Sequence, residues 1–122
     1  MVASLDQLDW LLGPAGRAVL ADLPPGELTP QQVLRLGGTL RRNHPPDRVA
    51  AAFALHDLRL RARAKFARAD EMVFTRAGLE QASAEAVARH RAVRFRGVGR
   101  LADLCTGIGG DLIALAGVAP TL

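Results

Sequence analysis

The sequence is poor in residues that stabilise secreted or membrane proteins. Its 122 residues include one cysteine, Cys105, and no tyrosine. A single cysteine excludes an internal disulfide, and aromatic residues at 4% leave few rings on which nucleic-acid bases could stack. No apolar run reaches the roughly 18 residues that a membrane-spanning helix needs, and the N-terminus lacks the pattern of a secretory signal. We therefore expect a cytoplasmic protein without a membrane segment.

Lysine is almost absent as well, because Lys65 is the one lysine among sixteen basic residues. The net charge is +4 and the isoelectric point is near 10.9, which favours a polyanionic partner such as RNA. The basic residues include two clusters: Arg59, Arg61, Arg63, Lys65 and Arg68, and then Arg89, Arg91, Arg94, Arg96 and Arg100. Cations also suit the C-terminal ends of helices without any ligand, and a GC-rich coding sequence favours arginine. RNA is thus an expected partner, and a solvated helix face is the alternative.

Apolar residues at helical spacing predict several helices within residues 1–96. We expect these helices over residues 4–12 and 14–23, from Thr29, over 46–66, and over 83–95. Thr29 and Gln32 fit a capping box, and Ser83 with Glu85 fits a capped, acidic first turn. The sequence therefore predicts a helical N-terminal domain over residues 1–96.

A different pattern follows in residues 97–122. A short apolar run, residues 101–105, leads into the glycine-rich stretch 106–110 and then into a predicted helix over 111–116. This order is typical of the first strand, loop and helix of a parallel α/β domain. We therefore predict a mainly α N-terminal domain followed by the first β-α unit of a truncated Rossmann-like α/β domain.

Three kinds of nucleotide loop compete for the glycine-rich stretch. A phosphate-binding P-loop is excluded because no lysine follows Gly110, and a dinucleotide fingerprint is disfavoured because Leu112 occupies its third glycine position. Asp103 at the predicted strand end would repel a pyrophosphate, whereas it can accept a charge-assisted hydrogen bond from the ammonium of a methionine moiety. The residues thus favour S-adenosylmethionine, and an ordinary turn into a capped helix stays open as the alternative.

Residues 103–111, D-L-C-T-G-I-G-G-D, resemble the D-x-C-x-G-x-G-G-[DN] motif of bacterial THUMP-like class I methyltransferases. They are also similar to the corresponding motif of the trimethylguanosine synthases, and residues 74–85 look like the segment that precedes the catalytic domain in both groups. The resemblance implies an S-adenosylmethionine-dependent methyltransferase that acts on RNA. It implies cofactor contacts from Asp103, Cys105, Gly107, Gly109, Gly110 and Ser83. Ser83 would contact the cofactor carboxylate or, alternatively, only cap its helix.

The sequence departs from this family in its catalytic part. A ribose-binding acid is expected about 20 residues beyond the glycines, after Leu122, and the Asn/Asp-Pro-Pro-aromatic motif has no counterpart here. We therefore expect the N-terminal part of a methyltransferase, incomplete as a catalyst, with unknown catalytic residues and with self-association through its incomplete sheet. The alternative is a helical RNA-binding or protein-interaction module with a vestigial methyltransferase motif.

Two other kinds of chemistry find little support. Cys105 is a possible nucleophile, but the spacing of the three histidines places none of them beside it. One cysteine and three scattered histidines also lack the spacing of metal ligands, so no metal site is predicted.

Overall fold

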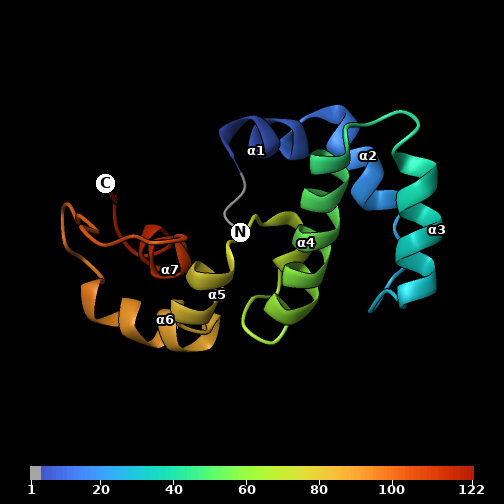
Figure 1. The fold of residues 1–122 in the computed structure, drawn as a ribbon. Helices are drawn as coiled ribbons and strands as arrows, with labels where there is room; N and C mark the ends of the chain where they lie inside the picture. Colours follow the sequence, from blue (N-terminus) through green and yellow to red (C-terminus); the bar gives the residue numbers. More distant parts are fainter. Residues whose placement is uncertain (1–3) are drawn as a thin grey trace. The chain divides into compact units, whose positions relative to one another are not determined.

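A computed structural model describes residues 4–122 of the chain (Figure 1). The chain forms two compact units, of which the first ends at Leu60 and the second runs from Arg61 to Leu122. Every regular element in the described residues is helical, and these residues form seven α-helices and two 3-10 helices. The domain boundary predicted after residue 96 stays a prediction.

The first unit is built from four helices. They are α1 (Leu5–Leu12), α2 (Pro14–Asp22), α3 (Pro30–Leu40) and α4 (Pro46–Ala62), whose last two residues belong to the second unit. The predicted capping box at α3 is confirmed, since the Gln32 N–H donates to Thr29 Oγ1 at 3.2 Å and the Thr29 N–H donates to Gln32 Oε1 at 2.9 Å. The helix predicted over residues 46–66 ends earlier than expected, at Ala62.

The core of the first unit is aliphatic. Its buried hydrophobic residues are Leu11, Val19, Leu23, Val49, Ala52 and Leu55. Gly16 lets α2 pack directly on α1, because a Cβ at this position would lie 2.3 Å from the Trp10 carbonyl oxygen and 2.6 Å from Leu11 Cα. The first unit is therefore held by branched side chains and by one close backbone contact.

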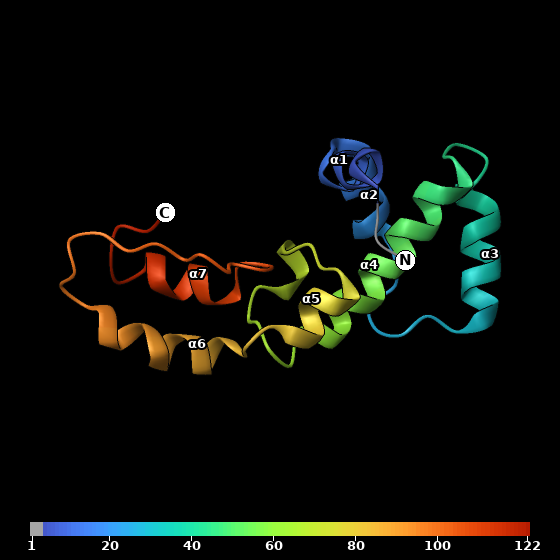
Figure 2. The ribbon, with the colours of Figure 1, turned by 60° about the vertical axis from the view of Figure 1, so that its left-hand side comes forward.

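The second unit continues from the end of α4 through shorter elements. They are η1 (Ala69–Glu71), α5 (Arg76–Gln81), α6 (Glu85–Ala92), η2 (Val93–Phe95) and α7 (Gly110–Ala116). The helix predicted over residues 111–116 is thus confirmed as α7. Figures 1 and 2 show α7 alongside α6, with the segment between them running back along the pair to the start of α7.

The Rossmann-like β-α unit predicted for residues 97–122 is wrong. No strand forms in the described residues, and Leu101 makes only an isolated parallel bridge to Thr121. Three backbone hydrogen bonds support this bridge: Leu101 N–H to Pro120 O at 2.9 Å, Leu122 N–H to Leu101 O at 2.9 Å, and Asp103 N–H to Leu122 O at 3.1 Å. A parallel strand is normally buried on both faces, whereas Leu104 in this run is 91% exposed. The apolar run therefore pairs only at its start, and Leu104 and Cys105 lie in a turn instead of a sheet.

Candidate functional site

Asp103 organises the start of the glycine-rich loop. One carboxylate oxygen, Oδ1, accepts from the Cys105 N–H at 3.1 Å, and the Asp103 carbonyl accepts from Thr106 Oγ1 at 2.9 Å. The Gly109 N–H then donates to the Thr106 carbonyl at 2.8 Å. Aspartate commonly initiates turns by such a bond to the backbone two residues ahead. The loop is therefore shaped by its own first residue.

Two of the predicted glycines are required by backbone conformation. Gly107 has φ of +57° and Gly109 has φ of +83°, in the left-handed region that residues with a Cβ rarely adopt. A Cβ at either position would meet no atom within 4 Å, so crowding does not explain the glycines. Gly107 is exposed, so a ligand can approach the backbone closely there, whereas Gly109 is buried.

Gly78 lets the loop pack on the rest of the second unit, and Gly110 lies in ordinary contact with the buried core. A Cβ at Gly78 in α5 would lie 2.2 Å from Ile108 Cγ2, and a Cβ at Gly110 would lie 3.4 Å from the Phe66 ring. Phe66 is itself buried and lies against Phe74, with 5.8 Å between the ring centroids. The C-terminal end of the loop thus lies on a small aromatic core, and Ile108 packs on α5.

A cavity of about 410 Å³ adjoins the loop. It is lined by residues of α6, η2, α7 and the bridge segment: Ala88, Arg91, Phe95, Leu101, Ala102, Asp103, Leu104, Cys105, Asp111 and Leu115. Asp103 and Cys105 thus share this cavity, whereas Gly107, Gly109, Gly110 and Ser83 are outside its lining. The volume falls in the range of about 300–1,000 Å³ that is usual for small-molecule sites.

Ser83 does not cap α6, so the predicted cap is wrong. The N-cap residue is Ala84, and no side chain caps this end. The Glu85 N–H instead donates to the Lys65 carbonyl at 2.8 Å, and Glu85 Oε2 accepts from the Ala67 N–H at 2.8 Å. The first turn of α6 is therefore bound by the turn that follows α4, a tertiary contact that replaces the local cap.

Arg91 links Ser83 to the cavity, and the sequence had marked it only as one member of a basic cluster. Its Nη1 donates to Asp111 Oδ1 at 2.7 Å and to Ser83 Oγ at 3.4 Å. Asp111 immediately follows the two glycines that open α7. An acid at the end of a glycine loop, with arginines on the preceding helix, was the signal in the sequence that could have identified this pair.

Many residues of the basic clusters have structural partners. Lys65 Nζ donates to the carbonyls of Leu79 at 2.7 Å and Ala82 at 2.8 Å, at the C-terminal end of α5. Four arginines form ion pairs: Arg63 with Asp70, Arg68 with Glu71, Arg89 with Glu85, and Arg91 with Asp111. The hydrogen bond and charge of Arg68 hold the pKa of the Glu71 carboxyl below its ordinary value of 4.5. The positive charge available to a polyanion is therefore smaller than the composition suggests.

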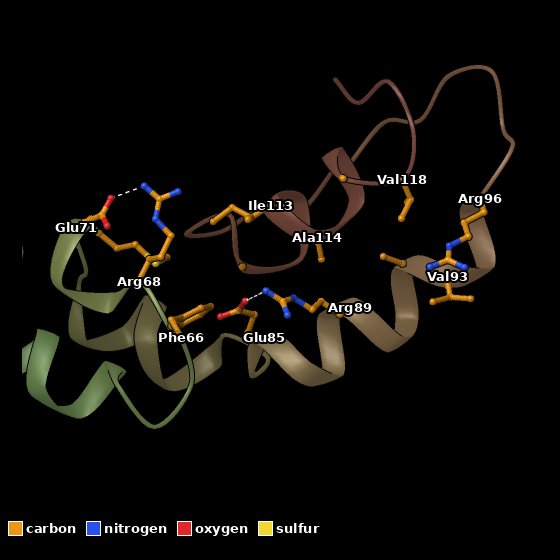
Figure 3. Close-up of a pocket in the computed structure, with 14 residues that line it drawn as sticks. Phe66, Arg68, Glu71, Glu85, Arg89, Val93, Arg96, Ile113, Ala114 and Val118 are labelled. Atoms are coloured by element: carbon orange, nitrogen blue, oxygen red, sulfur yellow. Dashed lines mark hydrogen bonds and ion pairs between the residues drawn. The ribbon is translucent and has the colours of Figure 1, made fainter.

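A second cavity of about 670 Å³ lies between α6, α7 and the segment around η1 (Figure 3). Phe66, Ile113, Ala114 and Val118 contribute apolar surface to it. The Arg68–Glu71 pair lies at one end of the cavity, and the Arg89–Glu85 pair lies along α6. Figure 3 shows Arg96 at the far end of the cavity from the Arg68–Glu71 pair. None of the residues predicted to bind a cofactor lines this cavity except Gly110.

Residues 4–122 offer neither a metal site nor a membrane-spanning helix. No group of three or more metal-ligating side chains gathers in this part of the chain. No helix in it is long and apolar enough to cross a membrane.

Residues 4–64 match the model of a family described as a domain of unknown function, DUF8688. The chain belongs to this family. The DUF8688 match covers half of the chain, includes α1 to α4 and ends two residues after α4. The cavity beside Asp103 therefore lies entirely outside the DUF8688 match. The comparisons with curated proteins and with solved structures gave no match.

Proposed function

We propose that the second unit binds S-adenosylmethionine as part of a methyltransferase that acts on RNA. The observation that carries the proposal is the Asp103 carboxylate, which lines a cavity of suitable size at the start of a loop with two left-handed glycines. This arrangement provides a negative charge and, at Gly107, exposed backbone. Asp103 follows an isolated bridge instead of a strand, so the proposal rests on the loop and the cavity.

The chemistry of the cavity fits this cofactor. Asp103 would hold the ammonium group of the methionine end, and a charge-assisted hydrogen bond of this kind is stronger than a neutral one. Phe95, Leu101 and Leu115 offer apolar surface to the uncharged parts of the ligand. When bound, S-adenosylmethionine supplies an electrophilic methyl group on a sulfonium. The residues of the chain bind and orient this group in the proposal, and none is assigned a catalytic step.

Three arginines near the end of α6 support RNA as the methylated substrate. Arg94, Arg96 and Arg100 are exposed and form none of the ion pairs found in residues 4–122. They lie on η2 and the segment that leads to Asp103, so they are close in sequence to the cofactor cavity. Unpaired arginines gain most from phosphate contacts, because counterion release from the nucleic acid favours binding.

Calorimetric titration with S-adenosylhomocysteine tests the cofactor site in the whole chain. Asp103→Asn keeps an oxygen that can accept from the Cys105 N–H but removes the charge, so the loop conformation is preserved. We expect this variant to bind about tenfold or more weakly, as loss of a charge-assisted bond implies. Asp9→Asn, on an exposed position of α1, is the matched control and should bind like the unchanged protein. The absence of any heat with folded protein would refute the proposal.

Fluorescence polarisation with a short labelled RNA tests the substrate class. Replacing Arg94, Arg96 and Arg100 with Gln should weaken binding and make it less sensitive to salt. The matched control replaces three arginines of the first unit, Arg35, Arg41 and Arg42. If RNA binding depended on Arg35, Arg41 and Arg42, and the protein did not bind S-adenosylhomocysteine, a helical RNA-binding module would be favoured instead.

A further inference from the structure

We infer that Arg91 receives the carboxylate of the cofactor's amino-acid end, which makes the cavity specific for a ligand with an α-amino-acid head. The inference rests on the proposed cofactor function and extends it to a recognition rule. An amino-acid head carries an ammonium and a carboxylate on one carbon. A site that offered only Asp103 to the ammonium would leave the ligand carboxylate close to a second carboxylate and without a cation of its own.

Arg91 is the one cation among the residues that line the cavity beside Asp103. Its guanidinium is bound on one side only, because Nη1 makes both of the contacts to Asp111 and Ser83. A guanidinium has five N–H donors, so Nε and Nη2 keep donors for a further acceptor. The Arg91 side chain is 48% exposed, so a ligand in the cavity can reach it.

Asp111 and Ser83 orient Arg91. Asp111 is 35% exposed and belongs to the first turn of α7, directly after the glycine loop. Its 2.7 Å bond to Arg91 therefore connects α6 to the same loop that Asp103 begins. This explains how Ser83 can influence the carboxylate end of the ligand through Arg91, although Ser83 lies outside the cavity lining.

The test compares two ligands that differ in the amino-acid end. S-adenosylhomocysteine has the complete head, whereas 5′-methylthioadenosine has the same nucleoside and sulfur without it. Arg91→Met keeps a long apolar side chain and removes the charge. We expect its dissociation constant for S-adenosylhomocysteine to rise about tenfold or more, and its dissociation constant for 5′-methylthioadenosine to stay unchanged.

Two more variants complete the design. Arg91→Lys retains the charge and should recover part of the affinity for S-adenosylhomocysteine. Arg89→Met removes another ion-paired arginine of α6, one that lies outside this cavity, and should change neither dissociation constant. Circular dichroism and the melting temperature of each variant report whether it is folded.

The outcomes separate the two proposals. An equal loss of affinity for both ligands would mean that Arg91 only maintains the structure, which overturns the inference while the cofactor site survives. Unchanged affinity for S-adenosylhomocysteine would likewise overturn it, since the carboxylate would then bind elsewhere. If the unchanged protein bound neither ligand, the proposed function itself would fail.

Discussion

The two units bury different kinds of side chain. The first unit relies on leucine and valine, with Ala52 as its one buried alanine. Five of the eight buried hydrophobic residues of the second unit are alanines, namely Ala62, Ala69, Ala88, Ala92 and Ala119. Alanine buries little apolar area but allows helices to approach closely. The second unit therefore depends on the few large side chains that it does bury.

Both units leave large apolar side chains exposed. Leu5 is 80% and Leu34 is 77% exposed in the first unit, and Leu104 is 91%, Leu122 is 76% and Ile113 is 59% exposed in the second, where all three lie close in sequence to the loop or the bridge. The family match covers mainly the first unit, whereas the candidate site lies wholly in the second. Each unit therefore has its own buried core, and the candidate cavity belongs to the second unit.

We expect the largest effect from replacing Phe66 in the core of the second unit. Phe66→Ala removes a ring that is 4% exposed and supports both Phe74 and Gly110, and such a truncation costs about 3–5 kcal/mol. We expect loss of S-adenosylhomocysteine binding and a lower free energy of unfolding of the second unit, measured by urea denaturation. Val87→Ala is the control, because this exposed α6 side chain lies outside the lining of both cavities and should contribute almost nothing. Equal stability of the two variants would contradict an aromatic core.

Gly16 should be the most sensitive glycine of the first unit. Gly16→Ala places a Cβ against the backbone of α1, which cannot move aside as a side-chain end could, and we expect a cost of about 3 kcal/mol. Gly38→Ala is the matched control, since this α3 position has open space around it. It should instead stabilise the protein by about 0.5–1 kcal/mol. Thermal unfolding of both variants would distinguish close packing from helix propensity, and a stable Gly16→Ala protein would rule out the contact.

The smallest expected effect concerns the ion pair between Arg68 and Glu71. Because this pair lowers the pKa of Glu71 in the folded protein, it stabilises the fold above the ordinary pKa of 4.5. That stabilisation is lost as the pH falls through the lowered pKa. Both side chains are exposed, so the pair contributes little to stability. Glu71→Gln should therefore only slightly reduce the pH dependence of the free energy of unfolding below neutral pH, as measured by urea denaturation at several pH values. A large loss of the free energy of unfolding at neutral pH would contradict a weak, exposed ion pair.

Local sequence signals predicted helix starts well. Thr29 and Gln32 formed the expected capping box, and the helix after the glycine loop appeared as α7. These features depend on residues within one helical turn of each other. Phe66 shows where local reasoning stops, because the predicted helix ended at Ala62 and the ring entered the core instead.

Features that depend on distant partners could not be predicted from the pattern. Residues 101–105 have the composition of a strand, but a strand needs neighbours, and one bridge to Thr121 is all that forms in the described chain. Ser83 has the right residue type for a cap, but the Glu85 N–H at the start of α6 donates to the Lys65 carbonyl instead. Arg91 is held beside the cavity by its bond to Asp111, which is twenty residues away in the sequence.

The single bridge between Leu101 and Thr121 has a consequence for handling the protein. The Ala102 N–H and C=O make no hydrogen bond within residues 4–122, and Leu104 beside them is exposed. An uncovered extended edge with an apolar neighbour is a template on which another chain can add a strand. Concentrated samples should therefore sediment faster than dilute ones, and Leu104→Lys should suppress this growth because a charge at an edge discourages pairing.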